Sequence, residues 1–289
     1  NTANNNTAVG DRAGSENTSG TQNTFLGAVS GRFNTTASNN TGIGYNSLGA
    51  NTTGTLGTAL GSNALAANTT GNSNTAIGYS SLLVNTTGQD NVAVGRATLD
   101  ANTTGGSNTA IGMQALSENT TADNNTAVGR NAMLVNTTGT QNVAVGSLAL
   151  DANTTGGNNT GLGYGSLGAN TTASNNTAVG RNAMGSNTTG GNNTAIGKAV
   201  MFLNTSGSNN TAVGFEALDA NTTASNNTAV GYDSLTANTT GGHNTAVGSR
   251  SLDANTTGAQ NTGIGDQALS SNSTGSDNTA VGQGALNNS

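Results

Sequence analysis

The residues that could carry out acid–base or nucleophilic chemistry are few in this chain of 289 residues. His243 is the only histidine and cysteine is absent, so a Ser–His–Asp or Cys–His arrangement would rest on His243 alone. Gly161, Gly163 and Gly165 form a Gly-x-Gly-x-Gly string, but no amphipathic helix follows it and no Gly-x-x-x-x-Gly-Lys-[Ser/Thr] phosphate loop occurs. We therefore expect no catalytic residue and no cofactor, and we predict that the chain is not an enzyme.

Side chains that could bind ligands recur at multiples of 17 residues. Four aspartates share one position of this 17-residue period but never in two consecutive periods. This spacing argues against the clustered carboxylates that calcium requires, and we expect no metal site. Four tyrosines and a phenylalanine share another point and could stack on sugars, although an exposed and tolerant surface position explains them equally. These residues are Asp100, Asp151, Asp219 and Asp253, and Tyr45, Tyr79, Tyr164, Phe215 and Tyr232.

Hydroxyl and amide groups recur with the same period. Rows of threonine suggest an ice-binding array, but the residue after the repeat's first asparagine shares its strand face with an aliphatic residue that we expect inside. Asn-Thr-Thr or Asn-Thr-Ser occurs in nearly every copy, as at Asn68-Thr69-Thr70, and matches the N-glycosylation acceptor pattern. Glycans on every copy would crowd one another at a spacing of about 4.8 Å.

All these residues belong to a repeat of 17 residues that fills the chain in 17 copies without insertion or deletion. Numbered from Asn6, the repeat reads Asn-Thr-Ala-Val-Gly-x-x-Ala-Leu-x-x-Asn-Thr-Thr-Gly-x-x. Position 5 is Gly and position 4 is Val, Ile or Leu in all 17 copies, and position 9 is Leu or Met in 15 of 17. A short fixed period is typical of a solenoid. Because the chain begins at position 13 and ends at position 12 without capping sequences, we expect it to be a window of a longer array.

The composition excludes several classes of protein. Aromatic residues make up 3% and charged residues 7%, and proline is absent. Such a composition could indicate disorder, but a repeat that never loses register argues for an ordered structure. The net charge of −6 is spread thinly, which predicts no nucleic-acid partner. The longest apolar run, residues 199–203, is too short to span a membrane.

The repeat predicts an all-β fold, a parallel β-solenoid or β-roll with one repeat per turn and 17 turns, forming one uninterrupted array over residues 1–289. We expect a strand at positions 2–4, a glycine corner at position 5, a second short strand at positions 8–9, and a further strand or turn at positions 12–15. The predicted corners include Gly10, Gly27, Gly44, Gly61, Gly78 and Gly95; the predicted asparagine ladders include Asn74, Asn91, Asn108, Asn68, Asn85 and Asn102; the predicted core includes Ile77, Val94, Ile111, Leu82, Leu99 and Leu116.

Positions 3 and 4 are neighbours on one strand, so their side chains point to opposite faces, yet both are restricted: small at 3, aliphatic at 4. With position 4 inside, the small residues at position 3 would form an outer surface that allows another chain to approach closely. This pattern favours a parallel homo-oligomer of three chains. The alternative is a lone solenoid whose small outer residues keep one face flat.

The string Asn-Thr-Ala-Val-Gly-x-x-Ala-Leu-x-x-Asn-Thr-Thr-Gly resembles the shaft repeats of bacterial and phage tail-fibre-domain proteins over the whole chain. It is more distantly similar to the head repeats of trimeric autotransporter adhesins, which form a left-handed β-roll trimer around an Ala-Ile-Gly-like core; matching segments are residues 75–78 and 194–197. The adhesin-head repeat is shorter than this one. The resemblance implies an extracellular, cell-surface or virion fibre.

We therefore expect a non-catalytic fibre shaft, trimeric, that presents or supports adhesion and contacts a host surface or glycan. The alternative is a binding solenoid with an ice-binding or glycan-binding surface.

Overall fold

The computed structural model describes residues 3–287 and shows a parallel β-solenoid with one 17-residue repeat per turn, here called a coil. The described residues contain no helix. The chain comprises two compact units, Asn1–Asn142 and Val143–Ser289. The first holds β1 (Thr7–Val9), β2 (Thr24–Leu26), β3 (Thr41–Ile43), β4 (Thr58–Leu60), β5 (Thr75–Ile77), β6 (Val92–Val94), β7 (Thr109–Ile111) and β8 (Thr126–Val128). The second holds β9 (Val143–Val145), β10 (Thr160–Leu162), β11 (Thr177–Val179), β12 (Thr194–Ile196), β13 (Thr211–Val213), β14 (Thr228–Val230), β15 (Thr245–Val247), β16 (Thr262–Ile264) and β17 (Thr279–Val281).

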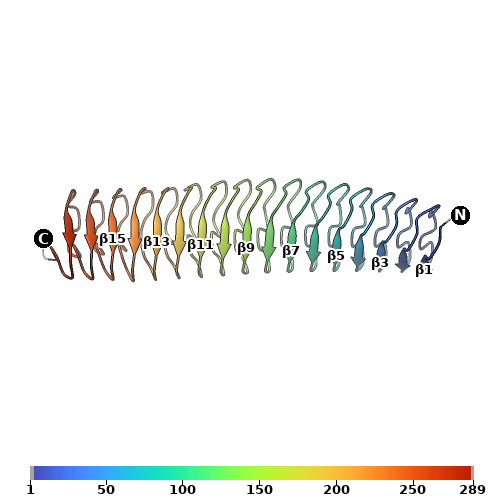
Figure 1. Ribbon diagram of the computed structural model, residues 1–289, viewed down its shortest axis with the longest axis horizontal. Coiled ribbons are helices and arrows are strands. Elements are labelled where there is room, and N and C mark those ends of the chain that lie inside the picture. The colour runs from blue at the N-terminus through green and yellow to red at the C-terminus, as the bar shows by residue number, and fades with distance from the viewer. Residues whose placement is uncertain (1–2, 288–289) are drawn as a thin grey trace. The chain divides into compact units, whose positions relative to one another are not determined.

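Within each unit, consecutive strands pair in parallel, so that they lie side by side and point the same way (Figure 1). The register aligns equal repeat positions, for example Thr7 with Thr24 and Val9 with Leu26. Side chains of one repeat position therefore form a column along the unit. The predicted strand at positions 2–4 is confirmed.

Positions 8–9 are not a strand, and this prediction was wrong. Position 9 adopts the left-handed conformation in every copy, with φ between 48° and 60°, as at Leu82 and Leu99. Tight turns close around it: Arg32 N donates to Val29 O at 3.3 Å, and Asn34 N donates to Gly31 O at 3.1 Å. A left-handed leucine costs about 1–2 kcal/mol, which its complete burial offsets with about 1.5–3 kcal/mol.

The predicted glycine corners are confirmed by their backbone. Gly10, Gly27, Gly44, Gly61, Gly78 and Gly95 have φ between 130° and 139°, which side chains rarely tolerate. The next coil also approaches closely: a Cβ on Gly10 would lie 2.6 Å from the carbonyl carbon of Gly27. The positive φ recurs in every copy, and the close approach recurs at most of these glycines, such as Gly112 and Gly265, which explains why position 5 never varies.

The interior is narrow and is filled mainly by positions 3, 9, 1 and 12. Leu82, Leu99 and Leu116 are fully buried, as predicted. Position 3 is also buried from β2 to β17, for example at Ala76 and Ala93. Since positions 3 and 4 face opposite ways, position 4 points outward.

The predicted core placement of Ile77, Val94 and Ile111 was therefore wrong. Ile77 and Val94 are half-buried and Ile111 is 41% exposed. One leucine per coil fills the interior so far that only a methyl group fits opposite it. At Gly263, also at position 3, even an added Cβ would lie 3.3 Å from Leu252 Cγ.

The first copies break the repeat at three positions that compensate for one another. Gly14 and Gly31 replace the leucine of position 9, and Phe25 replaces the alanine of position 3. The Phe25 ring is 2% exposed and fills the vacated space: a Cβ on Gly14 would lie 3.1 Å from Phe25 Cδ2, and a Cβ on Gly31 would overlap the ring. The core is thus kept full by a different arrangement of side chains.

Candidate functional surfaces

The predicted asparagine ladder at position 12 is present and buried. Asn68 Nδ2 donates to Asn51 Oδ1 at 2.8 Å, Asn85 Nδ2 to Asn68 Oδ1 at 2.9 Å, and Asn102 Nδ2 to Asn85 Oδ1 at 2.8 Å. Each amide also donates to the backbone carbonyl three residues later, as from Asn85 to Gly88 O at 3.0 Å. The side chains thereby satisfy polar groups that would be costly to leave unpaired inside the solenoid.

The predicted ladder at position 1 is also present, and here a backbone donor joins the side-chain amide. The side-chain oxygen of Asn74 accepts mainly from the backbone N–H of Asn91, at 3.0 Å, with the Asn91 amide at 3.2 Å. Asn108 N likewise donates to Asn91 Oδ1 at 3.0 Å. Because a backbone donor needs no side chain, glycine can replace asparagine in this column: Gly57 N donates to Asn40 Oδ1 at 2.7 Å.

The asparagines of the Asn-Thr-Thr motifs are the buried residues of the position 12 ladder. Asn68 is 2% exposed and Asn204 is 0% exposed, and both side-chain amides donate hydrogen bonds inside the coil. An oligosaccharide transferase cannot reach these nitrogens in the folded chain. The motif follows from the ladder, and glycosylation of these residues is incompatible with the fold.

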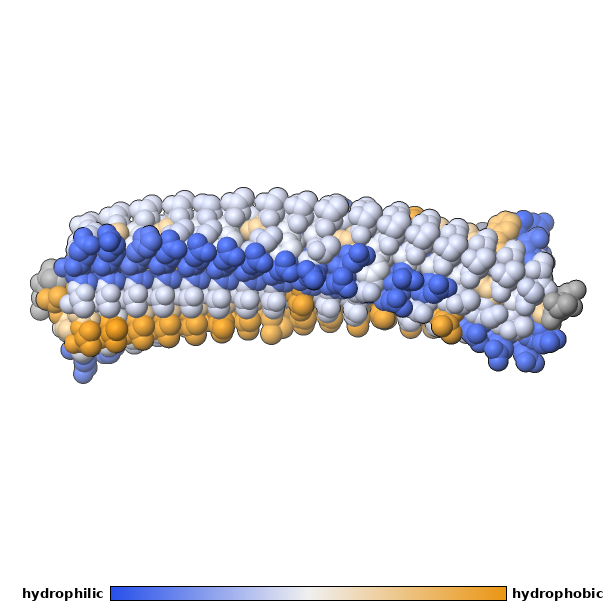
Figure 2. Space-filling model, turned by 45° about the horizontal axis from the view of Figure 1, so that its top comes forward, coloured by the Kyte–Doolittle hydropathy of each residue, from blue (hydrophilic) through white to orange (hydrophobic). Residues whose placement is uncertain are grey.

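The outer face of the strands is an uncharged surface of threonine and aliphatic side chains, here called the strand face. It consists of positions 2 and 4, which carry no charged residue in any copy. None of the 17 aliphatic residues at position 4 is buried, and the exposed ones reach 68% at Val281. Figure 2 shows this row as an orange band along the second unit. Contiguous apolar surface of this kind typically marks an interaction site.

Position 6 forms a second exposed column, which carries rings and cations. In the second unit, Phe215 and Tyr232 stack with ring centroids 5.6 Å apart and an interplanar angle of 10°. Lys198 Nζ lies 4.9 Å from the Phe215 ring centroid, and the Arg181 guanidinium lies 6.0 Å from that of Tyr164. In the first unit, Tyr45 and Tyr79 are each 59% exposed.

The aspartates of position 10 do not lie close to enough other acidic or histidine side chains to form a metal site. Burial raises the pKa of Asp151, Asp219 and Asp253, and for Asp219 the neighbouring Glu216 raises it further. One carboxylate oxygen each of Asp219, Asp233 and Asp253 is buried without a hydrogen-bond partner. Across residues 3–287, no group of three or more His, Cys, Asp or Glu side chains could hold a metal ion.

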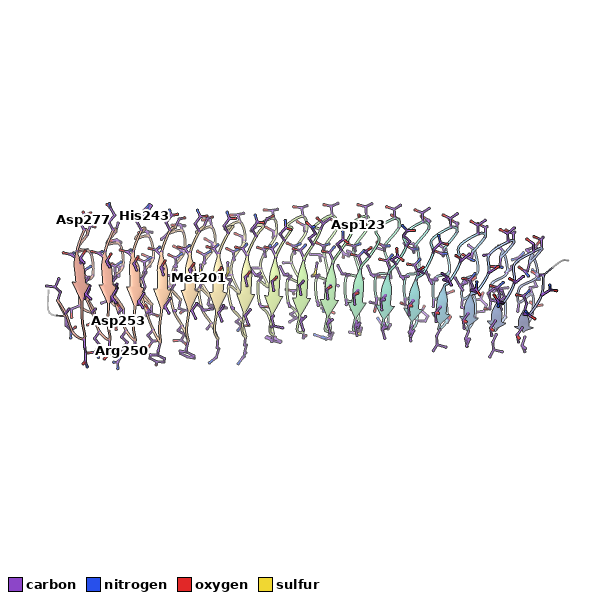
Figure 3. The ribbon with its side chains drawn as sticks, viewed as in Figure 1. Asp123, Met201, His243, Arg250, Asp253 and Asp277 are labelled. Carbon is purple, nitrogen blue, oxygen red and sulfur yellow. The ribbon has the colours of Figure 1, made fainter. Side chains whose placement is uncertain are left out.

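His243 is exposed at position 17, on the opposite edge of the coil from Arg250 (Figure 3). Its left-handed φ of 61° matches that of every other described residue in this column. Gly163 and Gly165 have φ of 133° and 61° and serve as a corner and a left-handed turn residue. Gly161 lies at the buried position 3, so this glycine string is a feature of the coil.

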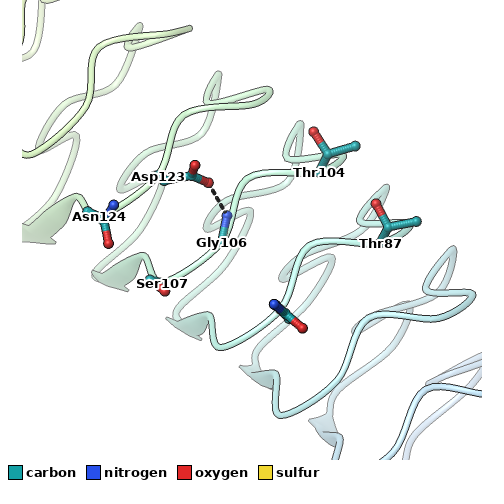
Figure 4. Close-up of a pocket in the computed structure, with 7 residues that line it drawn as sticks. Thr87, Thr104, Gly106, Ser107, Asp123 and Asn124 are labelled. Atoms are coloured by element: carbon teal, nitrogen blue, oxygen red, sulfur yellow. Dashed lines mark hydrogen bonds between the residues drawn. The ribbon is translucent and has the colours of Figure 1, made fainter.

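A shallow polar groove of about 430 Å³ crosses three coils of the first unit (Figure 4). It forms because Gly106 leaves a gap between the longer side chains of Gln89 and Asp123. Asp123 Oδ1 accepts a hydrogen bond from Gly106 N at 2.6 Å, which occupies one carboxylate oxygen. The remaining lining, Thr87, Thr104, Ser107 and Asn124, offers only hydroxyl and amide groups.

The fold and these surfaces define a parallel β-solenoid with one strand per coil. No family model matches the sequence, and no curated protein matches it either. Residues 3–287 include no helix that could span a lipid bilayer.

Proposed function

We propose that this chain is a non-catalytic structural shaft of an extracellular or virion fibre, which assembles from parallel copies and presents or supports adhesion. The observation that carries the proposal is the strand face, where the aliphatic side chain of position 4 is exposed or half-buried in every copy and is never buried. In a monomer, this row exposes apolar surface to water along each unit. A soluble protein gains from covering such a surface with another chain.

The contact surface of the proposed assembly differs from the one expected from the sequence. The small residues of position 3 lie inside the coil, so they cannot form it. Positions 2 and 4 take that role: threonine methyl groups and Val, Ile or Leu form two in-register rows of the kind that interdigitate when two β-sheets pack face to face. The number of copies, three, comes from the resemblance to trimeric fibre repeats.

Multi-angle light scattering of the whole chain tests this assembly. Lysine on two neighbouring strands, in Ile196→Lys/Val213→Lys, should shift the particle towards the mass of a single chain, because a charge buried in an apolar contact is costly. The matched control is Thr189→Lys/Ser206→Lys, which adds the same charge at the exposed position 14 of adjacent coils. A stable monomer for the unmodified chain at micromolar concentration would overturn the proposal.

A second candidate, an ice-binding surface, is favoured by the hydroxyls of the strand face. The threonines of position 13 donate their hydroxyls to backbone carbonyls, as Thr52 Oγ1 does to Thr69 O at 2.9 Å. Within residues 3–287, the threonine hydroxyls of position 2 donate no hydrogen bond to the chain. These regularly spaced groups therefore face water. Thermal hysteresis by the unassociated chain, abolished by Thr194→Lys but not by Thr189→Lys, would establish this function; its absence removes the candidate.

A further inference from the structure

Tyr45 and Tyr79 are the two aromatic residues of the position 6 column in the first unit, and each is 59% exposed. They lie two coils apart, and the coil between them carries Ser62 at the same position. Tyr45 has no ring one coil away on either side, since its neighbours in the column are Ala28 and Ser62. The small serine thus leaves a gap in the column with an aromatic residue at each end.

The stacked pair in the second unit shows how rings of this column are arranged. Phe215 and Tyr232 occupy position 6 of consecutive coils, and their rings lie nearly parallel with centroids 5.6 Å apart. Two strand spacings amount to about 10 Å. A ligand ring seated midway between Tyr45 and Tyr79 would be about 5 Å from each aromatic ring, within the range of aromatic stacking contacts of about 4.5–7 Å.

The three coils around the gap are neutral and partly polar at positions 6 and 7, and the nearest charge in the column, Arg96, lies one coil beyond Tyr79. At position 7, Asn46 Nδ2 donates to Asn63 Oδ1 at 3.0 Å, which leaves further amide hydrogens and lone pairs free for a ligand. Ser62 adds a hydroxyl. Positions 6 and 7 of these three coils carry no charged residue. A suitable ligand therefore has two apolar ring faces, a rim of hydroxyls and no charge.

We propose that Tyr45, Ser62 and Tyr79 form a binding site for one ring of a neutral oligosaccharide, which lies between the two tyrosines with its hydroxyls towards Asn46 and Asn63. The aromatic pair in the second unit leaves no room for a ligand ring, because Phe215 and Tyr232 stack directly on each other and Lys198 lies over Phe215. The site is independent of the proposed assembly, since all its residues come from one chain.

Isothermal titration of the whole chain with cellohexaose, maltohexaose and chitohexaose tests the site. We expect saturable binding of at least one of them, weakened about tenfold or more by Tyr45→Ala or Tyr79→Ala, which corresponds to about 1.4 kcal/mol. Tyr45→Phe keeps the ring and should retain binding. Tyr164→Ala removes a ring of the same column that lies outside the site and is 51% exposed, and it should leave binding unchanged.

The sharpest variant is Ser62→Tyr, which adds a ring rather than removing one. It should fill the gap with a stack like that of Phe215 and Tyr232, and so abolish binding while the chain stays folded, as unchanged far-ultraviolet circular dichroism would verify. Absence of binding by all three hexasaccharides at millimolar concentration would overturn the proposal. Binding that survives Ser62→Tyr would overturn it as well.

Discussion

Phe25→Ala should destabilise the first coils far more than a phenylalanine truncation at a surface. The ring is 2% exposed, and the position 9 residues beside it are Gly14 and Gly31, which have no side chains with which to fill the vacated space. Because the lining cannot collapse, we expect a loss of about 3–5 kcal/mol, the usual range for a buried Phe→Ala change. Gly31→Leu alone should also destabilise, by about 1–3 kcal/mol, because its side chain would overlap the Phe25 ring.

The combined variant Phe25→Ala/Gly14→Leu/Gly31→Leu restores the common pattern of the other coils and should recover most of the loss. The backbone already permits it: φ is 60° at Gly14 and 53° at Gly31, close to the 48–58° of the leucines and methionines at position 9. The two kinds of substitution should therefore be strongly coupled.

Native-state hydrogen exchange is the appropriate assay, because a repeat protein opens locally and a single unfolding midpoint would hide the effect. Useful probes are the amides of Thr24, bonded to Asn40 O at 2.8 Å, and Gly31, bonded to Ser47 O at 2.9 Å. The Leu235 amide, bonded to Ser251 O at 2.9 Å in the second unit, serves as the internal control. If the combined variant protects Thr24 no better than Phe25→Ala does, the compensation argument is refuted.

Three further perturbations probe the ladder, the corners and the buried acids. Asn85→Ala should cost about 1–3 kcal/mol for each buried group left unpaired, whereas exposed Gln89→Ala should have little effect in the same exchange experiment. Gly95→Ala should destabilise strongly, because φ is 139° and the added Cβ would lie 2.7 Å from Gly112 O; Gly168→Ala, with its nearest atom 3.3 Å away, should be mild. Burial raises the pKa of Asp219, so its contribution to stability is fully present below the unfolded value of 3.8 and is lost as pH rises through the folded pKa. Asp219→Asn should therefore increase thermal stability at pH 7 and leave it unchanged near pH 3, and an equal effect at both pH values would contradict the assignment.

Several features could be predicted from the sequence because each follows from a local requirement. Invariant glycine at position 5 indicates a backbone that a side chain would not tolerate, and Gly78 and Gly95 meet that description through both φ and close approach. Asparagine repeated without slippage indicates stacked amides, and Asn68, Asn85 and Asn102 stack as predicted.

The direction of the strand could not be predicted in the same way. Alternation shows that positions 3 and 4 face opposite sides but leaves open which one is inside. That choice depends on the width of the interior. The leucines of position 9, such as Leu82 and Leu99, point inwards from a left-handed turn and leave little space opposite them. Leucine has no intrinsic preference for that conformation, so neither the turn nor the narrow core could be read from the residue type. Similarly, no local pattern connects Phe25 with glycines in two different coils.

The mass of the unmodified chain in solution, measured by multi-angle light scattering at micromolar concentration, tests the proposed assembly most directly. We predict a particle with three times the mass of one chain, shifted towards a single chain by Ile196→Lys/Val213→Lys and unaffected by Thr189→Lys/Ser206→Lys. A monodisperse monomer with the strand face exposed would contradict the account.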